Sequence, residues 1–301
     1  MITNFNELFD ALRSRSRKRM IAAWGVDDHT ITAASLAIEK GIVDVTLVGD
    51  KDMILSVCAN EKIDPSIFTI IDNKNELDSI AQAVAMVKDG LGDILMKGLC
   101  STDKYMRGIL NKERGLLPPK AVLSHVSVVE NPNYHKLIIL GDMAVIPAPD
   151  FKQKQAICKY LVATAKAMGI AKPKVAAIAA TEQMLDGMPA CVEAALLAKM
   201  SDRGQIAGCV IDGPLALDVA IDAESVAIKK IKSEVAGDAD CLLFPNIESA
   251  NVFYKVNSKL CKGVRQAAIV AGAQAPCVLS SRADSIDTKL NSIALAALTA
   301  K

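Results

Sequence analysis

A serine and an arginine stand side by side where the chain passes from an expected strand into its last helix. Ser281 and Arg282 follow the strand expected over residues 277–280, and Asp284 and Ser285 come just before the helix. The N–H groups and dipole of a helix N-terminus favour a bound anion, and a guanidinium can hold a phosphate or a developing oxyanion with two parallel hydrogen bonds. Ordinary capping by Asp284 or Ser285, with Arg282 as a surface charge, explains the pattern equally well.

Two further strand ends carry polar residues. Asp212 ends an expected strand, and Gly213-Pro214 is expected to turn the chain. Asn246 and Asn251 follow the strand expected over residues 240–244. Ligands of open α/β sheets bind at the carboxyl ends of the strands, so these residues are candidate ligand contacts. A plain turn at Gly213-Pro214 and helix capping by Ser249 are the alternatives.

The run 96–103 is a fourth junction. Gly98 allows the backbone to approach a ligand, and Thr102 offers a hydroxyl. The run is not a phosphate-binding P-loop, because no G-x-x-x-x-G-K-[ST] occurs in the chain, and no G-x-G-x-x-G occurs either. His125 stands near an expected strand end without a recognisable nucleophile partner, so a structural histidine is favoured.

Strands and helices are expected to alternate along nearly the whole chain. Strands that are apolar on both faces and alternate with helices indicate parallel sheets covered on both sides, and right-handed crossovers make them doubly wound. The pattern predicts strands over 19–24, 44–49, 68–71, 93–96, 137–140, 174–179, 206–211, 240–244 and 277–280, and helices over 28–40, 53–60, 76–88, 150–167, 190–200, 264–273 and from 285. The proline-rich run 146–149 is the best linker candidate, so we expect two α/β domains with a cleft between them.

Charge and composition exclude several classes of protein. The 35 basic and 34 acidic residues give a net charge of +1, which argues against a large nucleic-acid interface. The eight cysteines form no C-x-x-C pair and have no histidine at zinc spacing, so we expect free, mostly buried thiols. We expect no signal peptide and no membrane span, and therefore a soluble cytoplasmic protein.

Taken together, four segments resemble the phosphate acetyl/butyryltransferase family. They are 97–102, 211–218 (Ile-Asp-Gly-Pro-Leu-Ala-Leu-Asp), 244–255 and 280–285 (Ser-Ser-Arg-Ala-Asp-Ser). They occur in the order that the family shows, and two of them look most like its phosphate butyryltransferase branch. The resemblance implies two α/β domains of the isocitrate-dehydrogenase-like type, made of residues 1–145 plus 275–301 and of residues 146–274, in a homodimer.

The resemblance also implies the reaction: acyl-CoA and inorganic phosphate give acyl phosphate and CoA, reversibly. It implies no metal, no permanently bound cofactor and no covalent enzyme intermediate. Ser281 and Arg282 match the family's serine-arginine pair, which would hold the acyl phosphate and offset charge at its carbonyl. The acetyl branch has an aspartate base for the CoA thiol seven residues after the serine, a position that Thr288 occupies here. Asp287 and Asp284 are the alternatives, with Asp287 preferred.

Other matches imply substrate contacts. Thr102 and Arg107 match family residues of the first domain, which implies contacts to CoA or phosphate, and Ser124 is a further candidate phosphate contact. Phosphate acetyltransferase is a close alternative function. A more distant one is a metal- and NAD(P)-dependent dehydrogenase of similar fold, for which Asp212, Asp218 and Asp222 have suggestive spacing. A CoA- or phosphate-binding regulator without activity is a third class.

Overall fold

The computed structural model describes residues 1–279 and 284–301, and its chain divides into two compact units. The terminal unit comprises residues 5–123 and 266–301, and the central unit comprises residues 1–4 and 124–265. The sequence predicts domain boundaries after residues 145 and 274, whereas the two units meet after residues 123 and 265. Residues 124–141 form two strands that pair with each other and then with a strand near residue 241, which ties them to the central unit.

The terminal unit carries six strands in the order β3-β2-β1-β4-β11-β10. Neighbours are parallel except β10 and β11, which run antiparallel. The strands are β1 (Lys18–Ala23), β2 (Val43–Gly49), β3 (Thr69–Asp72), β4 (Ile94–Lys97), β10 (Arg265–Ala271) and β11 (Cys277–Val278). The helices are α1 (Phe5–Arg13), α2 (Asp28–Glu39), α3 (Lys51–Glu61), α4 (Glu76–Lys88), α5 (Thr102–Ile109) and α11 (Ile286–Thr299), with a 3-10 turn over Pro65–Ile67.

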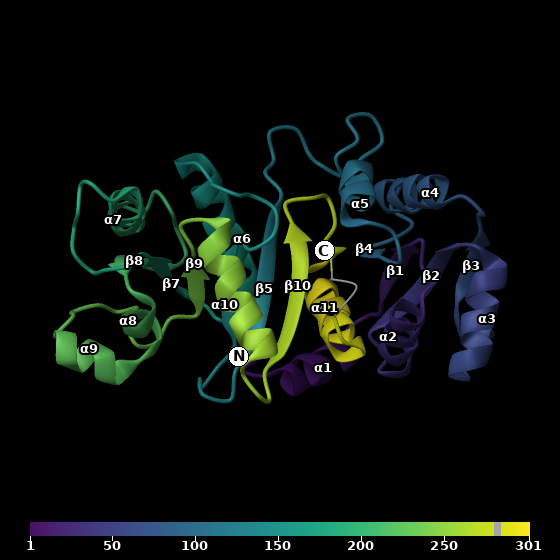
Figure 1. Cartoon of the computed structure of the whole chain (residues 1–301), viewed down its shortest axis with the longest axis horizontal. Coiled ribbons are helices and arrows are strands. Elements are labelled where there is room, and N and C mark those ends of the chain that lie inside the picture. The colour runs from purple at the N-terminus through teal and green to yellow at the C-terminus, as the bar shows by residue number, and fades with distance from the viewer. Residues whose placement is uncertain (280–283) are drawn as a thin grey trace. The chain divides into compact units, whose positions relative to one another are not determined.

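Helices cover both faces of these strands. α2 packs against α3 and α11, and α1 packs against α11, whereas α4 packs against α5 and β1 (Figure 1). Because both faces are covered, β1 and β4 are apolar on each side; the last four residues of β1 and all four of β4 are buried. This is the doubly wound α/β arrangement that the sequence predicts.

The central unit carries five strands in the order β5-β6-β9-β7-β8, parallel except for β5 and β6. Its apolar core joins the inner strands to α8 and α10, and α6 and α7 pack on β6, β9 and β8. The strands are β5 (Ser124–Glu130), β6 (Ile138–Gly141), β7 (Lys174–Ile178), β8 (Val210–Leu215) and β9 (Cys241–Leu243). The helices are α6 (Phe151–Ala167), α7 (Pro189–Asp202), α8 (Leu217–Ile221), α9 (Ala223–Lys229) and α10 (Ile247–Lys259).

Two predicted elements are wrong. The helix predicted over 264–273 is strand β10, which is buried along its middle on both faces, so its apolar run carries no period that separates a strand from a helix. The strand predicted over 206–211 begins only at Val210, because Gly208 has a left-handed φ of 78°. Gly213-Pro214 therefore lies inside β8 and is not a turn; β8 is an edge strand, where a proline needs no ladder partner.

The final helix is fixed to the sheet by polar contacts as well as apolar ones. The Ser292 hydroxyl, fully buried in α11, donates to the Thr288 carbonyl at 2.7 Å and accepts from the Ala268 N–H of β10 at 2.9 Å. Asn291 donates to the Gln266 carbonyl at 3.3 Å. These bonds set the position of α11 along β10, and so the position of its first turn.

We predict that Ser292→Ala lowers the free energy of unfolding by about 1–3 kcal/mol, because it leaves the buried Ala268 N–H unpaired. Urea unfolding followed by circular dichroism measures the loss. Ser14→Ala, which removes an exposed hydroxyl bonded to the Ala11 carbonyl, is the control and should change stability by less than about 0.5 kcal/mol. Equal stability of the two variants would contradict this role.

Candidate active site

The backbones of two neighbouring strands approach closely at their carboxyl ends in the terminal unit. Just after β4, the Gly98 N–H donates to the Ala23 carbonyl and the Leu99 N–H donates to the Trp24 carbonyl, each at 3.0 Å. A Cβ on Gly98 would lie 2.1 Å from the Trp24 oxygen, so only glycine fits. Trp24 itself has a φ of 53°, which turns the chain out of β1 towards α2.

A cavity of about 160 Å³ opens beside this contact, within the terminal unit. It lies where ligands of α/β sheets bind, at the carboxyl ends of β1 and β4 and beside the N-terminus of α2. Gly98 and Leu99 form part of its wall. Its charged and titratable lining residues are Asp27, Asp28, His29, Lys97 and Lys289.

Both lysines of the cavity are buried, each 3% exposed. The Lys97 ammonium donates to the Gly98 and Cys100 carbonyls at 3.1 and 2.9 Å, which fixes the loop after β4. Burial lowers the pKa of Lys289, and the nearby carboxylates of Asp27 and other acidic residues oppose that shift. Two buried ammonium groups beside a helix N-terminus suit an anionic or strongly polar ligand.

The N-terminus of α2 connects the cavity to the segment before α11. One carboxylate oxygen of Asp27, Oδ1, accepts from the Thr30 N–H at 2.9 Å and caps α2. The ring nitrogen Nδ1 of His29 lies 3.3 Å from the Asp284 carbonyl oxygen. Asp284, which sequence analysis named as a candidate base, thus contacts a cavity-lining residue through its main chain.

The other residues predicted near α11 differ in what the structure shows of them. Ser281 and Arg282 lie outside the described residues. Asp287, in the first turn of α11, is exposed and is not among the lining residues of the cavity within the described part of the chain. Ser285 caps α11 by accepting from the Thr288 N–H, so the capping half of the sequence interpretation holds for this residue.

The predicted contacts of the first domain lie on a helix that sequence analysis did not identify. Thr102 is the first residue of α5 and is exposed, and Ser101 caps the helix. Arg107 is exposed as well, and its Nε lies 3.0 Å from a carboxylate oxygen of Asp103 one turn earlier. Both side chains are accessible to a ligand, and no contact of theirs joins them to the cavity among the described residues.

The remaining four candidates belong to the central unit. Ser124 begins β5 and is fully buried, and its hydroxyl has no hydrogen-bond partner among the described residues. Asp212 accepts from the N–H of Gly213 at 2.8 Å inside β8. Asn246 caps α10, where sequence analysis had considered Ser249, and Asn251 donates to the Met143 carbonyl at 3.0 Å.

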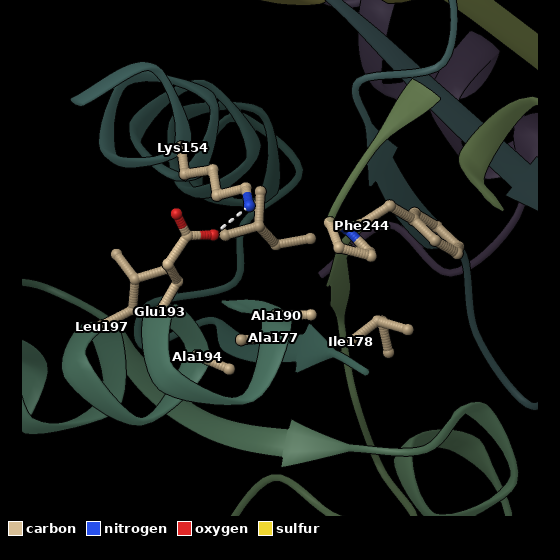
Figure 2. Close-up of a pocket in the computed structure, with 10 residues that line it drawn as sticks. Lys154, Ala177, Ile178, Ala190, Glu193, Ala194, Leu197 and Phe244 are labelled. Carbon is tan, nitrogen blue, oxygen red and sulfur yellow. Dashed lines mark hydrogen bonds and ion pairs between the residues drawn. The ribbon is translucent and has the colours of Figure 1, made fainter. Parts of the chain in front are cut away.

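The central unit has a small hollow of its own at the carboxyl ends of β7 and β9. Its volume is about 10 Å³, room for roughly one water molecule. Figure 2 shows the Lys154 ammonium of α6 paired with the Glu193 carboxylate of α7 at one side, with Ile178 and Phe244 at the other. The Lys154 side chain is 9% exposed, so this ion pair is largely shielded from solvent.

Sequence analysis missed Asp27, His29 and Lys289. The signal was present, because residues 27–29 follow a strand end in the same way as the four junctions that were chosen. Lys289 lies one turn after Ile286 and one turn before Ile293 on an apolar face of the last helix, and a charged residue at a core position is informative. Among residues 1–279 and 284–301, no group of three or more His, Cys, Asp or Glu side chains could hold a metal ion, and none of the eight cysteines forms a disulfide.

Comparison with known proteins settles the family. A profile described as phosphate acetyl/butaryl transferase matches residues 73–297. The chain belongs to this family. It is 44% identical over its full length to the phosphate butyryltransferase of Clostridium acetobutylicum, of which it covers 99%. It is 37% identical to the phosphate acetyltransferase of Thermotoga maritima, with 98% of this chain and 99% of the relative covered.

Solved structures support the same fold. A branched-chain phosphotransacylase from Enterococcus faecalis superposes with a TM-score of 0.82 at 27% identity, covering 94% of this chain and 98% of the other. A 4-hydroxythreonine-4-phosphate dehydrogenase from Burkholderia phymatum superposes with a TM-score of 0.55 at 13% identity, covering 95% of this chain and 99% of the other, which shows a shared fold only. No helix in the described part of this family member is long and apolar enough to cross a bilayer.

We predict that Gly98→Ala destabilises the protein by more than about 1 kcal/mol, because its Cβ would overlap the Trp24 main chain and push the ends of β1 and β4 apart. Thermal unfolding measures the effect. Gly187→Ala is the matched control, since nothing lies within 4 Å of a Cβ at that position. A Gly98→Ala variant as stable as Gly187→Ala would show that the contact is not as tight as described.

Proposed function

We propose that this protein transfers a butyryl or related short acyl group reversibly between coenzyme A and inorganic phosphate. The observation that carries the proposal is the 44% identity to two clostridial phosphate butyryltransferases over the whole chain. Identity to phosphate acetyltransferases is lower, at 36% and 37% over a similar length. The chain therefore stands nearer to the butyryl branch, as the segments 211–218 and 280–285 also indicate.

The residues assigned by resemblance keep their proposed roles. Ser281 and Arg282 would bind the phosphate of the acyl phosphate and stabilise negative charge on the carbonyl oxygen as the tetrahedral species forms. The cavity supports this proposal, because Lys289 belongs to the helix that follows Ser281 and Arg282 in the sequence, and Lys97 ends β4, the strand paired with β11; both lysines provide positive charge. Thr102, Arg107 and Ser124 remain candidate contacts to CoA or phosphate.

The protein's main contribution would be to hold two substrates together. Phosphate is an adequate leaving group, so the reaction needs a deprotonated thiol and a fixed approach to the carbonyl. CoA and acyl-CoA act as substrates, and we propose no permanently bound cofactor. We further propose that the enzyme is a cytoplasmic homodimer.

Phosphate acetyltransferase is the second candidate, supported by the full-length acetyltransferase relatives. The dehydrogenase alternative has less support. Asp218 pairs with Lys229 at 2.8 Å, and Asp222 caps α9, so the aspartates that were spaced suggestively in the sequence have other structural roles.

We predict phosphate-dependent release of free CoA from acyl-CoA by the purified protein, with a higher kcat/KM for butyryl-CoA than for acetyl-CoA. Thiol titration with acetyl-, propionyl- and butyryl-CoA, with and without phosphate, measures this. A preference for acetyl-CoA would assign the acetyl branch instead. Binding of every acyl-CoA without turnover would contradict the enzyme proposal and favour a regulator.

We predict that Arg282→Ala lowers kcat by about a hundred- to a thousandfold, because it removes a cation that stabilises the developing oxyanion. Its melting temperature should stay close to that of the wild type. Arg203→Ala, at the exposed end of α7, is the control and should keep full activity. An unchanged rate in Arg282→Ala would remove this residue from the mechanism.

A further inference from the structure

Asp27 lines the cavity, and one of its carboxylate oxygens has no hydrogen-bond partner among the described residues. Its Oδ1 is fixed by the Thr30 N–H, whereas its Oδ2 is buried and has no hydrogen-bond partner among the described residues. A buried acceptor without a donor costs roughly 1–3 kcal/mol, and native structures keep such groups rarely. The missing donor therefore points to a ligand that brings a proton into the cavity.

Charged groups of both signs lie around Asp27. The buried Lys289 ammonium interacts electrostatically with Asp27 and also with Asp28 and Asp284. The groups that face Asp27 around the cavity come from α2, β4 and α11 and from the segment before α11; they are Asp28, His29, Lys97, Lys289 and Asp284. Asp27 therefore lies within reach of a buried cation and of other acidic side chains.

We propose that Asp27 is the general base for the CoA thiol, a role that rests on the proposed acyl transfer. In the direction from acyl phosphate, Asp27 Oδ2 takes the proton from the thiol as sulfur bonds to the acyl carbon. The bond between that carbon and the phosphate oxygen breaks, and its electron pair leaves with phosphate, which then accepts the proton. In the opposite direction protonated Asp27 returns a proton to the departing thiolate.

The candidates from sequence fit this role less well. The position at which the acetyl branch has its aspartate is Thr288, whose side chain cannot act as a base at neutral pH. Asp287 is exposed on the surface of α11. Asp284 contacts the cavity-lining His29 through its main-chain oxygen and is not itself among the lining residues in the described part of the chain. Asp27 alone combines a fixed carboxylate oxygen with a second one that has no partner among the described residues.

The test is the pH dependence of acyl transfer to CoA in Asp27→Asn. Asparagine caps a helix as well as aspartate does, so α2 and the fold should be kept. At pH 7 we expect kcat/KM for CoA to fall by about a hundredfold or more. The loss should shrink as the pH approaches about 8.5, where the thiol ionises without help. A purely structural role would instead lower the rate by a similar factor at every pH.

Two further variants keep the test decisive. Asp50→Asn changes the aspartate that caps α3 in the same unit and should leave the rate and its pH profile unchanged. If Asp27→Asn does not fold, Asp27→Ser provides another capping residue that cannot take up a proton. If the wild-type enzyme forms acyl-CoA and the Asp27 variants keep its rate, the inference about Asp27 is wrong. The same holds if the variants lose activity by the same factor at every pH. Either result would leave the proposed function intact. A wild type without acyl transfer would instead overturn the proposed function.

Discussion

The candidate active site depends on one steric constraint, the approach of the Gly98 main chain to that of Trp24. Because there is no side chain at position 98, the ends of β1 and β4 come close enough for two hydrogen bonds between the segments that follow them. The chain then leaves β1 through a left-handed residue and begins α2 at Asp28. The capping Asp27 and the buried Lys97, which line the cavity, take their positions from this junction.

Electrostatics gives the site its chemical character. Lys97 is held by main-chain carbonyls, and Lys289 is buried beside acidic side chains, so neither ammonium is exposed as a surface lysine would be. Burying a charge is costly unless it is compensated by partners, and a protein keeps such an arrangement where it serves a ligand. The hydrogen bonds of Ser292 fix α11 against β10 and so fix the position of Lys289.

The sequence predicts the α/β layers well and the site only partly. Runs with clear boundaries, such as α4, were located to the residue, and the family was identified from four short segments. β10 was missed because an evenly apolar run has no period. Asp27 was missed for a different reason: an aspartate after a strand is a common helix cap, and only the three-dimensional structure shows that its second oxygen lacks a donor. The local sequence therefore predicts that Asp27 caps a helix, but not which groups surround its side chain.

We propose that this protein transfers an acyl group from a thioester to inorganic phosphate. Phosphorus NMR of the purified protein with butyryl-CoA and inorganic phosphate tests it most directly. We expect a new acyl phosphate resonance that grows in step with free CoA and disappears when CoA is added in excess. Free CoA appearing without acyl phosphate would mean thioester hydrolysis and would contradict the account.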